Sequence, residues 1–327
     1  MADDQVSEPM QLSLFAVEKP EPEYTSRSVE LVLQPDTPLE TAIGAFVKYM
    51  ADRGFSSHTQ QAFRLDILLL RDYMGPAAAV ADVSTATLNA FLRWVESGRG
   101  IPCSPKTLER RVTTLKVFFG WLADEGVLSR DVSAPLIHRA VSAPLPETLS
   151  DEEISALLEV TQALRQGIGA SAPDARPHLL ITLILAAGIK KSECVDIHLN
   201  HLDLTDPEHP ALWIRYRNTR RRHKERRISL PADLVGVLNE YLVQYPSRQK
   251  VFPWTGRNLE YVLTGVAETA GVGRLTFEIL RWTCALRDFC DGMDPDALRR
   301  TLGLSEIRWY EVETRLDMLA RQRGHRA

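Results

Sequence analysis

Eight basic residues crowd the thirteen positions from 215 to 227. They are Arg215, Arg217, Arg220, Arg221, Arg222, Lys224, Arg226 and Arg227. Like charges at this density repel one another unless a polyanion neutralises them, and a nucleic acid backbone does so while releasing counterions. The stretch therefore predicts a phosphate-binding surface in preference to a solvated loop without a partner.

A second candidate is the segment GIKKSECVDI, residues 188–197, which follows the apolar run 179–187. It has the pattern of one helix ending and another beginning, with Lys190 and Lys191 at the junction. The preceding segment RPHLLITLILAAG is apolar nearly all round, which is typical of a buried helix. Two lysines would thus stand at the end of a core element.

The basic stretch must be positioned by an element of its own. In PALWIRYRNTRRRHKERRISLP, apolar and basic residues alternate on either side of a basic centre, which predicts a β-hairpin with a basic apex. The segment LSDEEISALLEVT opens this second domain with a capping box formed by Ser150 and Glu153. From residue 232 to the end the pattern is helical again. Residues 139–148 have no periodicity and two prolines, so we expect a linker there.

Residues 37–138 predict a compact domain of four helices. The first segment, TPLETAIGAFVKYMADRGFS, has Thr37 as its expected N-cap and Gly54 as its stop. The next three helices, in SSHTQQAFRLDILLLRDYMG, STATLNAFLRWVES and SPKTLERRVTTLKVFFGWLADEGV, each open on serine. In the first helix one face is apolar: Leu39, Ile43, Phe46, Val47 and Met50.

Residues 1–36 differ in composition from the rest of the chain. Eight acidic and two basic residues give them a net charge of −6, whereas the whole chain carries −4, so the remainder is slightly basic at +2. With four prolines and little periodicity, this segment predicts a disordered arm. One island, QLSLF, interrupts it, and could dock on a partner through Gln11, Leu12, Leu14 and Phe15.

Several classes of protein are excluded by the sequence. No stretch approaches the roughly 18 apolar residues of a membrane span, and the acidic N-terminus does not resemble a secretory signal. The four cysteines lack zinc-type spacing, so we expect no metal site, and their scattered positions favour a reducing cytoplasm. No cofactor is expected either. About two domains fit the 327 residues.

From residue 37 to about 315, the order of these segments resembles the tyrosine recombinase (phage integrase) family. The resemblance is carried by HTQQAFRLDILLLRDYM, SPKTLERRVTTLKVFFGWLADEGVL, DVSAPL and LPETLSDEEISALL. It implies a mainly α fold with a small β-sheet, in which a helical core-binding (SAM-like) domain, residues 37–138, and a catalytic domain, residues 149–327, form a C-shaped clamp on duplex DNA.

The family's chemistry implies roles for particular positions. A tyrosine attacks a phosphodiester, two arginines hold the phosphate oxygens, and a hairpin lysine protonates the leaving oxygen. The hairpin lysine matches Lys224, and the second arginine matches Arg281 in FEILRWT. The first arginine is replaced by Lys190, which keeps the charge but loses the planar fork that grips two oxygens.

The other three positions depart further from the family pattern. The histidine of the second motif is replaced by Glu278, whose charge repels a phosphate unless Lys190, Lys191 or Arg281 pairs with it. Leu304 replaces the histidine of the third motif and cannot donate a hydrogen bond. Glu313 stands where the nucleophilic tyrosine is expected. The resemblance therefore predicts a degenerate catalytic pocket.

Tyr310 is the remaining candidate nucleophile, three residues before the expected position. Three residues on a helix advance about 4.5 Å and turn roughly 300°, which places the hydroxyl elsewhere. A misplacement of about 1 Å can already cost on the order of 100-fold in rate. Tyr310 and Trp309 are therefore interpreted first as packing or surface aromatics.

These observations favour a DNA-binding protein that acts as an accessory or site-recognition factor in recombination or in integration of a mobile element. It would bind DNA alone, as a homo-oligomer or beside active recombinases, in the bacterial cytoplasm near the nucleoid. Phosphate contacts are expected from Lys106, Arg110, Arg111, Lys116, Arg217, Arg220, Arg221, Arg222 and Arg226.

Two alternatives stay open at this point. The first is an active recombinase that uses Tyr310 and forms covalent DNA adducts. The second is an adaptor, because QLSLF resembles the peptide by which bacterial proteins dock on the replication sliding clamp. That adaptor would depend on residues 1–20 and little on residues 220–222.

Overall fold

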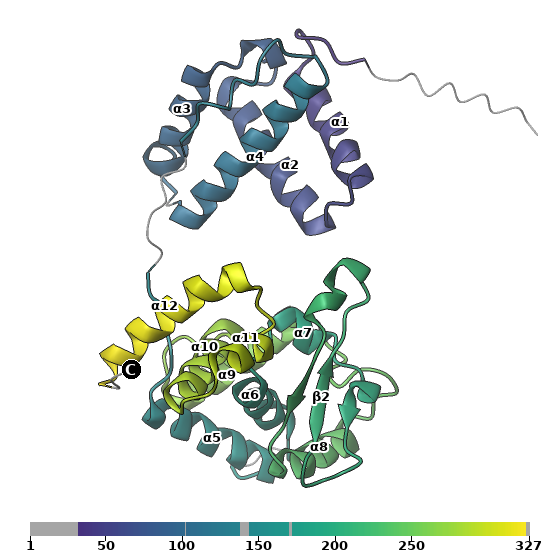
Figure 1. Cartoon of the computed structure of the whole chain (residues 1–327), viewed down its shortest axis with the longest axis vertical. Helices are drawn as coiled ribbons and strands as arrows, with labels where there is room; N and C mark the ends of the chain where they lie inside the picture. Colours follow the sequence, from purple (N-terminus) through teal and green to yellow (C-terminus); the bar gives the residue numbers. More distant parts are fainter. Residues whose placement is uncertain (1–31, 102, 138–143, 170–171, 325–327) are drawn as a thin grey trace, which may run out of the picture. The chain divides into compact units, whose positions relative to one another are not determined.

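The computed structural model describes residues 32–101, 103–137, 144–169 and 172–324. The chain divides into two compact units, Met1–Ala143 and Pro144–Ala327 (Figure 1). The predicted arm with its QLSLF motif and most of the predicted linker lie outside the described residues. The domain boundaries and the clamp arrangement stay predictions.

The first unit is helical, as the sequence predicts. Its elements are α1 (Leu39–Asp52), α2 (Ser57–Met74), the 3₁₀ turn η1 (Val80–Asp82), α3 (Thr85–Arg93), the π-helical turn η2 (Trp94–Gly98) and α4 (Pro105–Asp124). The serine that precedes each of α2, α3 and α4 accepts a hydrogen bond from a backbone N–H in the first helical turn. These three caps fix where the helices begin.

The predicted cap of α1 is wrong. The N-cap is Pro38, and the Thr37 hydroxyl instead accepts a hydrogen bond from the backbone N–H of Gln34 at 2.8 Å. A contact distant in sequence replaces the cap, because the N–H of Leu39 donates to the carbonyl of Ala78 at 2.9 Å. The first free N–H of the helix is thereby satisfied without a side chain.

Aromatic side chains from α1 and α4 form the centre of the first unit's core. Phe46 lies 5.0 Å from Phe118 and 5.4 Å from Trp121, measured between ring centroids. One carboxylate is buried beside this core: Asp66 of α2 accepts a hydrogen bond from Thr114 of α4 at 2.9 Å. Its burial ties α2 to α4 through a polar contact as well as through apolar packing.

The second unit contains a three-stranded sheet and the remaining helices. Its elements are α5 (Asp151–Gln166), α6 (Arg176–Ala187), α7 (Lys191–Val195), η3 (Leu199–His201), β1 (Leu202–Asp203), β2 (Ala211–Ile214), η4 (Thr219–Lys224), β3 (Arg226–Ser229), α8 (Asp233–Gln244), α9 (Gly256–Ala270), α10 (Phe277–Cys290), α11 (Pro295–Thr301) and α12 (Glu306–Gln322). With the first unit, this gives the predicted fold class, mainly α with a small sheet.

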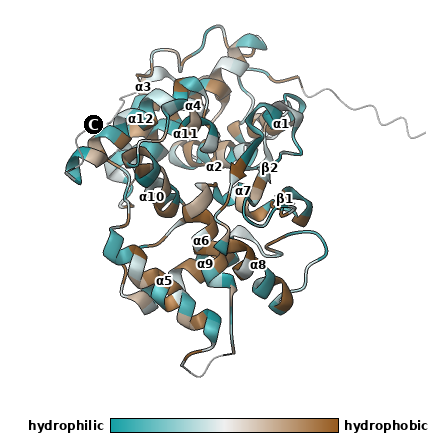
Figure 2. Cartoon of the chain, turned by 60° about the horizontal axis from the view of Figure 1, so that its bottom comes forward, coloured by the Kyte–Doolittle hydropathy of each residue, from teal (hydrophilic) through white to brown (hydrophobic). Residues whose placement is uncertain are grey.

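Helix α6 is the central element of the second unit. It packs against α5, α8, α9 and α10, and Figure 2 shows its hydrophobic colouring beside the mixed surface of α5. The predicted capping box of α5 is confirmed, since Ser150 accepts from the N–H of Glu153 at 3.2 Å and Glu153 accepts from the N–H of Ser150 at 2.8 Å. Gly188 ends α6 at φ +56°, in the left-handed region.

The predicted hairpin is also confirmed. Strands β2 and β3 pair antiparallel, with Leu212 opposite Ile228 and Ile214 opposite Arg226. Between them η4 forms the apex, and β1 adds a third strand on the other side of β2. Among the described residues, no helix is both long and apolar enough to span a lipid bilayer.

Candidate phosphate-binding site

Glu193 lies at the centre of the site, in the short helix α7. Its side chain is 1% exposed and accepts hydrogen bonds from the N–H of Lys190 at 2.9 Å and from Arg226 Nη2 at 3.0 Å. The Tyr216 hydroxyl donates to the same carboxylate. Burial alone would raise the pKa of Glu193, but the hydrogen bonds and charge of Arg226, with the charge of Lys190, lower it to about 2.

Arg226 is held from both sides. Its side chain is 8% exposed, and its Nε donates to the carbonyl of Thr301, the last residue of α11, at 2.7 Å. Gly303 passes so close that a Cβ there would lie 2.6 Å from Arg226 Nη1. The guanidinium therefore links the end of α11 to α7 by hydrogen bonds. Because its N–H groups already donate to Glu193 and to the carbonyl of Thr301, the phosphate contact predicted for Arg226 is not favoured.

Arg281 of α10 is buried beside this pair. It donates to the carbonyls of Gly188 and Leu302, the latter at 2.7 Å. Desolvation lowers the pKa of this guanidinium, while the charges of Glu193 and Glu278 oppose the shift. The side chain thereby links the end of α6 to the loop after α11, because the carbonyls of both segments accept hydrogen bonds from the same guanidinium.

Lys190 is the more accessible cation of the site. Its side chain is 36% exposed, its Nζ donates to the carbonyl of Gly303 at 3.3 Å and lies 3.6 Å from Glu193 Oε1. Burial lowers the pKa of Lys190, and the charges of Arg281, Arg226 and Lys224 lower it further against the pull of Glu193. Lys224, at the end of the hairpin apex, is therefore close enough to repel Lys190.

These five residues, Lys190, Glu193, Lys224, Arg226 and Arg281, are called the Glu193 cluster below. Lys190 and Arg226 contact Glu193, Arg281 interacts with it through its charge, and Lys224 acts on Lys190. The cluster carries a net charge of +3 when all five groups are ionised. Repulsion of this size at a partly buried site is relieved by an anion. The arrangement brings together the three retained or near-retained positions that the sequence predicted: Lys190, Lys224 and Arg281.

Glu278 does not join the cluster through an ion pair. It is exposed in the first turn of α10, and no cation of the described residues lies within ion-pair distance of it. Lys191, one of its three expected partners, instead pairs with Glu260 at 2.7 Å. The Glu278 carboxylate acts on the site only at longer range, by raising the pKa of Arg281.

The remaining substituted positions lie after α11 and in α12. Leu304 packs against the apolar cluster that joins α10 to α12, and Glu313 is half-buried. Tyr310 is 71% exposed, and no partner for its hydroxyl is present among the described residues. Its neighbour Trp309 is 7% exposed and belongs to the core, so the two aromatics point in different directions.

In the first unit, the four predicted DNA contacts divide into two pairs. Arg110 Nη1 lies 2.9 Å from Asp66 Oδ2, and Arg111 Nε lies 3.4 Å from Asp66 Oδ1 with a side chain only 12% exposed. Lys106 is exposed and Lys116 half-buried, and neither has an ion-pair partner among the residues described. The two lysines are thus free for a phosphate, whereas Arg111 is committed to the buried carboxylate.

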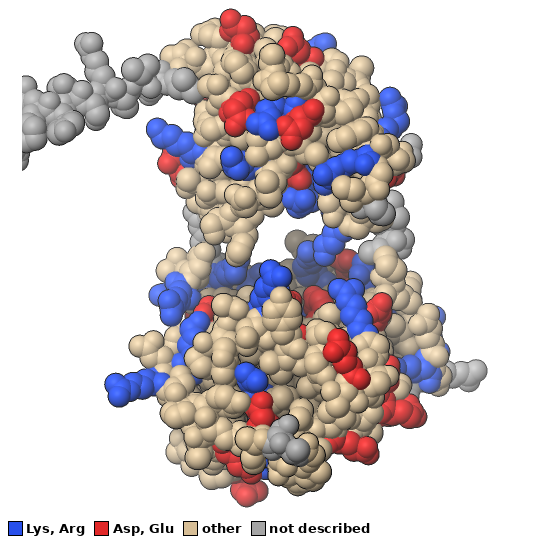
Figure 3. All heavy atoms as spheres, turned by 180° about the vertical axis from the view of Figure 1, so that it is seen from behind, with Lys and Arg blue, Asp and Glu red and all other residues tan. Residues whose placement is uncertain are grey.

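The hairpin apex presents the densest free positive charge. Arg217, Arg221 and Arg222 are exposed, and within the described part of the chain no carboxylate pairs with them. Figure 3 shows lysine and arginine side chains gathered at the end of the second unit that carries the apex. Arg220 belongs to the 3₁₀ turn η4 that forms this apex.

Sequence reasoning missed two functions at this site. Glu193 was part of the matched pattern, but its role as the shared acceptor of Lys190 and Arg226 needs the fold. Tyr216 lies in the predicted hairpin segment without a role assigned to it, and in the structure its hydroxyl donates a hydrogen bond to Glu193. The available signal was the spacing of Glu193, three residues after Lys190, which is the spacing of a capping box.

Three comparisons place these observations among known proteins. Residues 43–126 match the model of the phage integrase N-terminal SAM-like domain. Over 157 residues the chain is 32% identical to tyrosine recombinase XerC of Erythrobacter litoralis, which covers 48% of each protein. It is 25% identical to XerC of Roseiflexus castenholzii over 84% of this chain and 88% of that protein.

Solved structures share the fold. XerH recombinase aligns with a TM-score of 0.71 at 17% identity over 90% of this chain and 96% of that chain. A λ integrase aligns with a TM-score of 0.64 at 16% identity over 84% of this chain and 77% of that one. Residues 43–126 thus match a phage integrase domain, and the chain as a whole is similar to tyrosine recombinases in sequence and in fold.

Proposed function

We propose that this protein binds duplex DNA and holds one backbone phosphate at the Glu193 cluster without cutting the strand. The observation that carries the proposal is the excess of positive charge in the Glu193 cluster, where four cations are grouped with one buried carboxylate. A phosphate supplies the missing negative charge. Lys190 and Lys224 would contact it, while Arg226 and Arg281 would hold the surrounding backbone in place and add to the positive potential.

We expect no strand cleavage because two residues that the family's chemistry requires are replaced near the Glu193 cluster. At position 313 a glutamate replaces the expected tyrosine, so the hydroxyl that would attack the phosphorus and form a phosphotyrosyl bond is missing there. Leu304 supplies no hydrogen bond to a phosphate oxygen. Without a nucleophile and with fewer donors than its relatives, the site would bind the ground state of a phosphodiester but not stabilise its transition state.

The fold neighbours support DNA as the ligand. XerH aligned above is bound to palindromic difH substrate in a post-cleavage complex, and the λ integrase is a dimer bound to a COC′ core site. By analogy, the chain would act in recombination as an accessory or site-recognition factor, as a homo-oligomer or beside an active recombinase. Integration of a mobile element is one setting for such a factor.

One observation favours a second candidate function. Tyr310 is exposed, so its hydroxyl is accessible to a DNA strand, and an active recombinase would use it as the nucleophile. Docking on the sliding clamp through residues 11–15 is a further proposal that rests on the sequence alone. The recombinase differs from the main proposal in that DNA would become covalently attached to the protein. The adaptor differs in that residues 1–20 would be needed for function and residues 220–222 would not.

The salt dependence of duplex binding tests the main proposal. Seven proposed side chains contact six phosphates, because Lys190 and Lys224 share one, and at about 0.9 per phosphate they predict a slope of log Kd against log salt of about 5 in magnitude. The seven side chains are Lys106, Lys116, Lys190, Arg217, Arg221, Arg222 and Lys224. Substituting Lys190→Gln together with Lys224→Gln should lower that magnitude by about 0.9, for the one phosphate that these two lysines share, as measured by fluorescence anisotropy with a labelled duplex.

The control is the charge-matched variant Arg257→Gln with Arg321→Gln, two exposed arginines of the same unit. It should leave the slope within about 0.5 of the unmodified protein. A slope near 1 for the unmodified protein, or an unchanged slope in the lysine variant, would remove the basis for a phosphate at the Glu193 cluster.

A further inference from the structure

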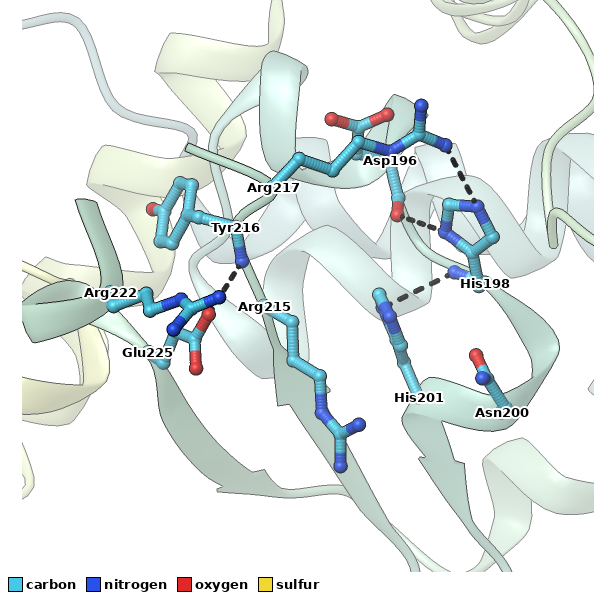
Figure 4. A pocket seen from close by; sticks show the side chains of 9 residues that line it. All are labelled: Asp196, His198, Asn200, His201, Arg215, Tyr216, Arg217, Arg222 and Glu225. Carbon is cyan, nitrogen blue, oxygen red and sulfur yellow. Dashed lines mark hydrogen bonds between the residues drawn. The ribbon is translucent and has the colours of Figure 1, made fainter. Parts of the chain in front are cut away.

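A second cationic pocket lies in the same unit and does not include the cations of the Glu193 cluster. It has a volume of about 450 Å³ and is formed by the segment around η3 and by the chain that follows β2 (Figure 4). Nine residues line it: Asp196, His198, Asn200, His201, Arg215, Tyr216, Arg217, Arg222 and Glu225.

Tyr216 separates the pocket from the cluster. Its hydroxyl donates to Glu193, whereas its backbone N–H donates to Glu225 Oε1 at 2.9 Å in the pocket. Figure 4 shows the Tyr216 ring directed away from Arg215, Arg217 and the two histidines. A ligand in this pocket would therefore bind on a different side of the hairpin from a phosphate at Lys190.

The pocket has an excess of positive charge. Both of its carboxylates are engaged: Asp196 pairs with Lys250 at 3.2 Å, and Glu225 accepts the N–H of Tyr216. No carboxylate of the described residues forms an ion pair with the three guanidinium groups of the pocket, those of Arg215, Arg217 and Arg222. The three arginines and Lys250 outnumber the two carboxylates, so the pocket keeps a net positive charge, which predicts an anionic ligand with several acceptor oxygens.

The histidines are arranged to support such a ligand. His198 Nδ1 lies 2.8 Å from the carbonyl of Asp196, so this nitrogen carries the proton, and Nε2 accepts from Arg217 Nη2 at 3.4 Å. His201 Nδ1 accepts from the N–H of His198 at 3.3 Å, which leaves its proton on Nε2. His198 thus orients Arg217, and His201 keeps a donor available at the pocket.

We propose that this pocket is a second phosphate-binding subsite, which takes a phosphodiester of the bound DNA. The proposal rests on the duplex binding proposed above and extends it by naming where a further backbone phosphate is held. Arg215 and Arg217 grip the phosphate oxygens as planar forks, and His201 donates one hydrogen bond through Nε2. Asn200, which is exposed at the pocket, offers an additional amide donor.

Phosphate binding at this place changes the titration of His201. In the free protein burial lowers the pKa of His201, the charges of His198 and Arg215 lower it further, and Asp196 and Glu225 oppose them. A bound phosphate adds negative charge and raises that pKa towards or above its usual value. Since the charged imidazolium then binds the phosphate more strongly, DNA affinity gains an extra increase as pH falls through this range.

Nuclear magnetic resonance of ring-labelled histidines in the full chain tests the subsite. We expect a duplex of about 30 base pairs to raise the pKa of His201 and to leave the chemical shifts of His209 where they are in the free protein. His209 is an exposed histidine of the same unit, 2.8 Å from Asp206, and serves as internal control. The His201→Gln variant identifies the signal and should weaken the pH dependence of DNA binding below pH 7.

A paired variant supplies the second measurement. Arg215→Gln with Arg217→Gln should abolish the DNA-dependent shift of His201, reduce duplex affinity at least about fivefold, and lower the salt slope by about 0.9 for one lost phosphate. Retention of the His201 shift and of the salt slope in this variant would overturn the proposal. The Arg257→Gln with Arg321→Gln variant controls for net charge.

The failure of the subsite and the failure of DNA binding give different results. If the unmodified protein binds the duplex but His201 does not respond, the subsite is wrong while duplex binding stands. If the duplex does not bind and inorganic phosphate or a mononucleotide alone shifts His201, the pocket takes a free phosphate compound. That outcome would overturn the assignment to DNA.

Discussion

The substitution Glu193→Gln is expected to destabilise the second unit by about 3–5 kcal/mol, the usual cost of leaving one partner of a buried ion pair alone. The carboxylate is 1% exposed, and its closest charged partner, Arg226, is 8% exposed, so solvent screens the pair little. Glutamine keeps the shape of the side chain but removes the charge that Arg226 and Lys190 face. Urea denaturation followed by tryptophan fluorescence measures the loss.

A matched variant separates this effect from the general loss of an ion pair. Glu240→Gln removes a carboxylate that pairs with Arg165 at 2.5 Å, but Glu240 is 47% exposed. Its loss should cost less than about 1 kcal/mol, as is usual for surface pairs. If the two variants lose the same stability, Glu193 does not organise the site as proposed.

The same pair predicts how stability depends on pH. The pKa of Glu193 falls from 4.5 in the unfolded chain to about 2 in the folded protein. The carboxylate therefore contributes its full stabilisation above pH 4.5 and loses it progressively as the pH falls towards 2. The stability difference between the unmodified protein and Glu193→Gln should shrink over this range, and a constant difference would contradict the assigned pKa.

Neutralising two arginines of the hairpin apex, Arg221→Gln with Arg222→Gln, is expected to weaken duplex binding by roughly 30-fold at 0.15 M salt. The figure follows from two phosphate contacts, each contributing about 0.9 to the salt slope. Both side chains are exposed and unpaired by carboxylates of the described residues, so folding should be unaffected. Anisotropy titrations at four salt concentrations give both affinity and slope.

The adaptor hypothesis makes the opposite prediction for this variant, because its DNA contacts would be incidental. The Arg257→Gln with Arg321→Gln variant carries the same change in net charge and should bind within about twofold of the unmodified protein. Equal losses in the two variants would show that binding depends on overall charge and not on the apex.

Local patterns were enough to predict much of the fold. The capping box of α5 depends on Ser150 and Glu153 alone, and the hairpin follows from alternation within one segment. The cap of α1 failed because Leu39 finds its acceptor at Ala78, about forty residues away. A sequence pattern contains no information about such a distant backbone partner.

The candidate site also combines features that local sequence predicts with features that depend on contacts between distant residues. Arg221 and Arg226 belong to one basic run and are chemically identical, yet one is exposed and the other is buried against Glu193. The difference depends on α7 lying beside the start of β3, which brings together residues 33 positions apart. The charge of the run could be predicted from the sequence, but the role of each arginine could not.

One measurement tests the central claim most directly. Tagged protein is incubated with sheared genomic DNA and captured, and one half is washed under native conditions while the other is washed in hot detergent. The retained DNA from both halves is then sequenced. We expect discrete sites in the native half and none in the detergent half. DNA that survives detergent, and is lost in Tyr310→Phe, would show that the protein cuts DNA.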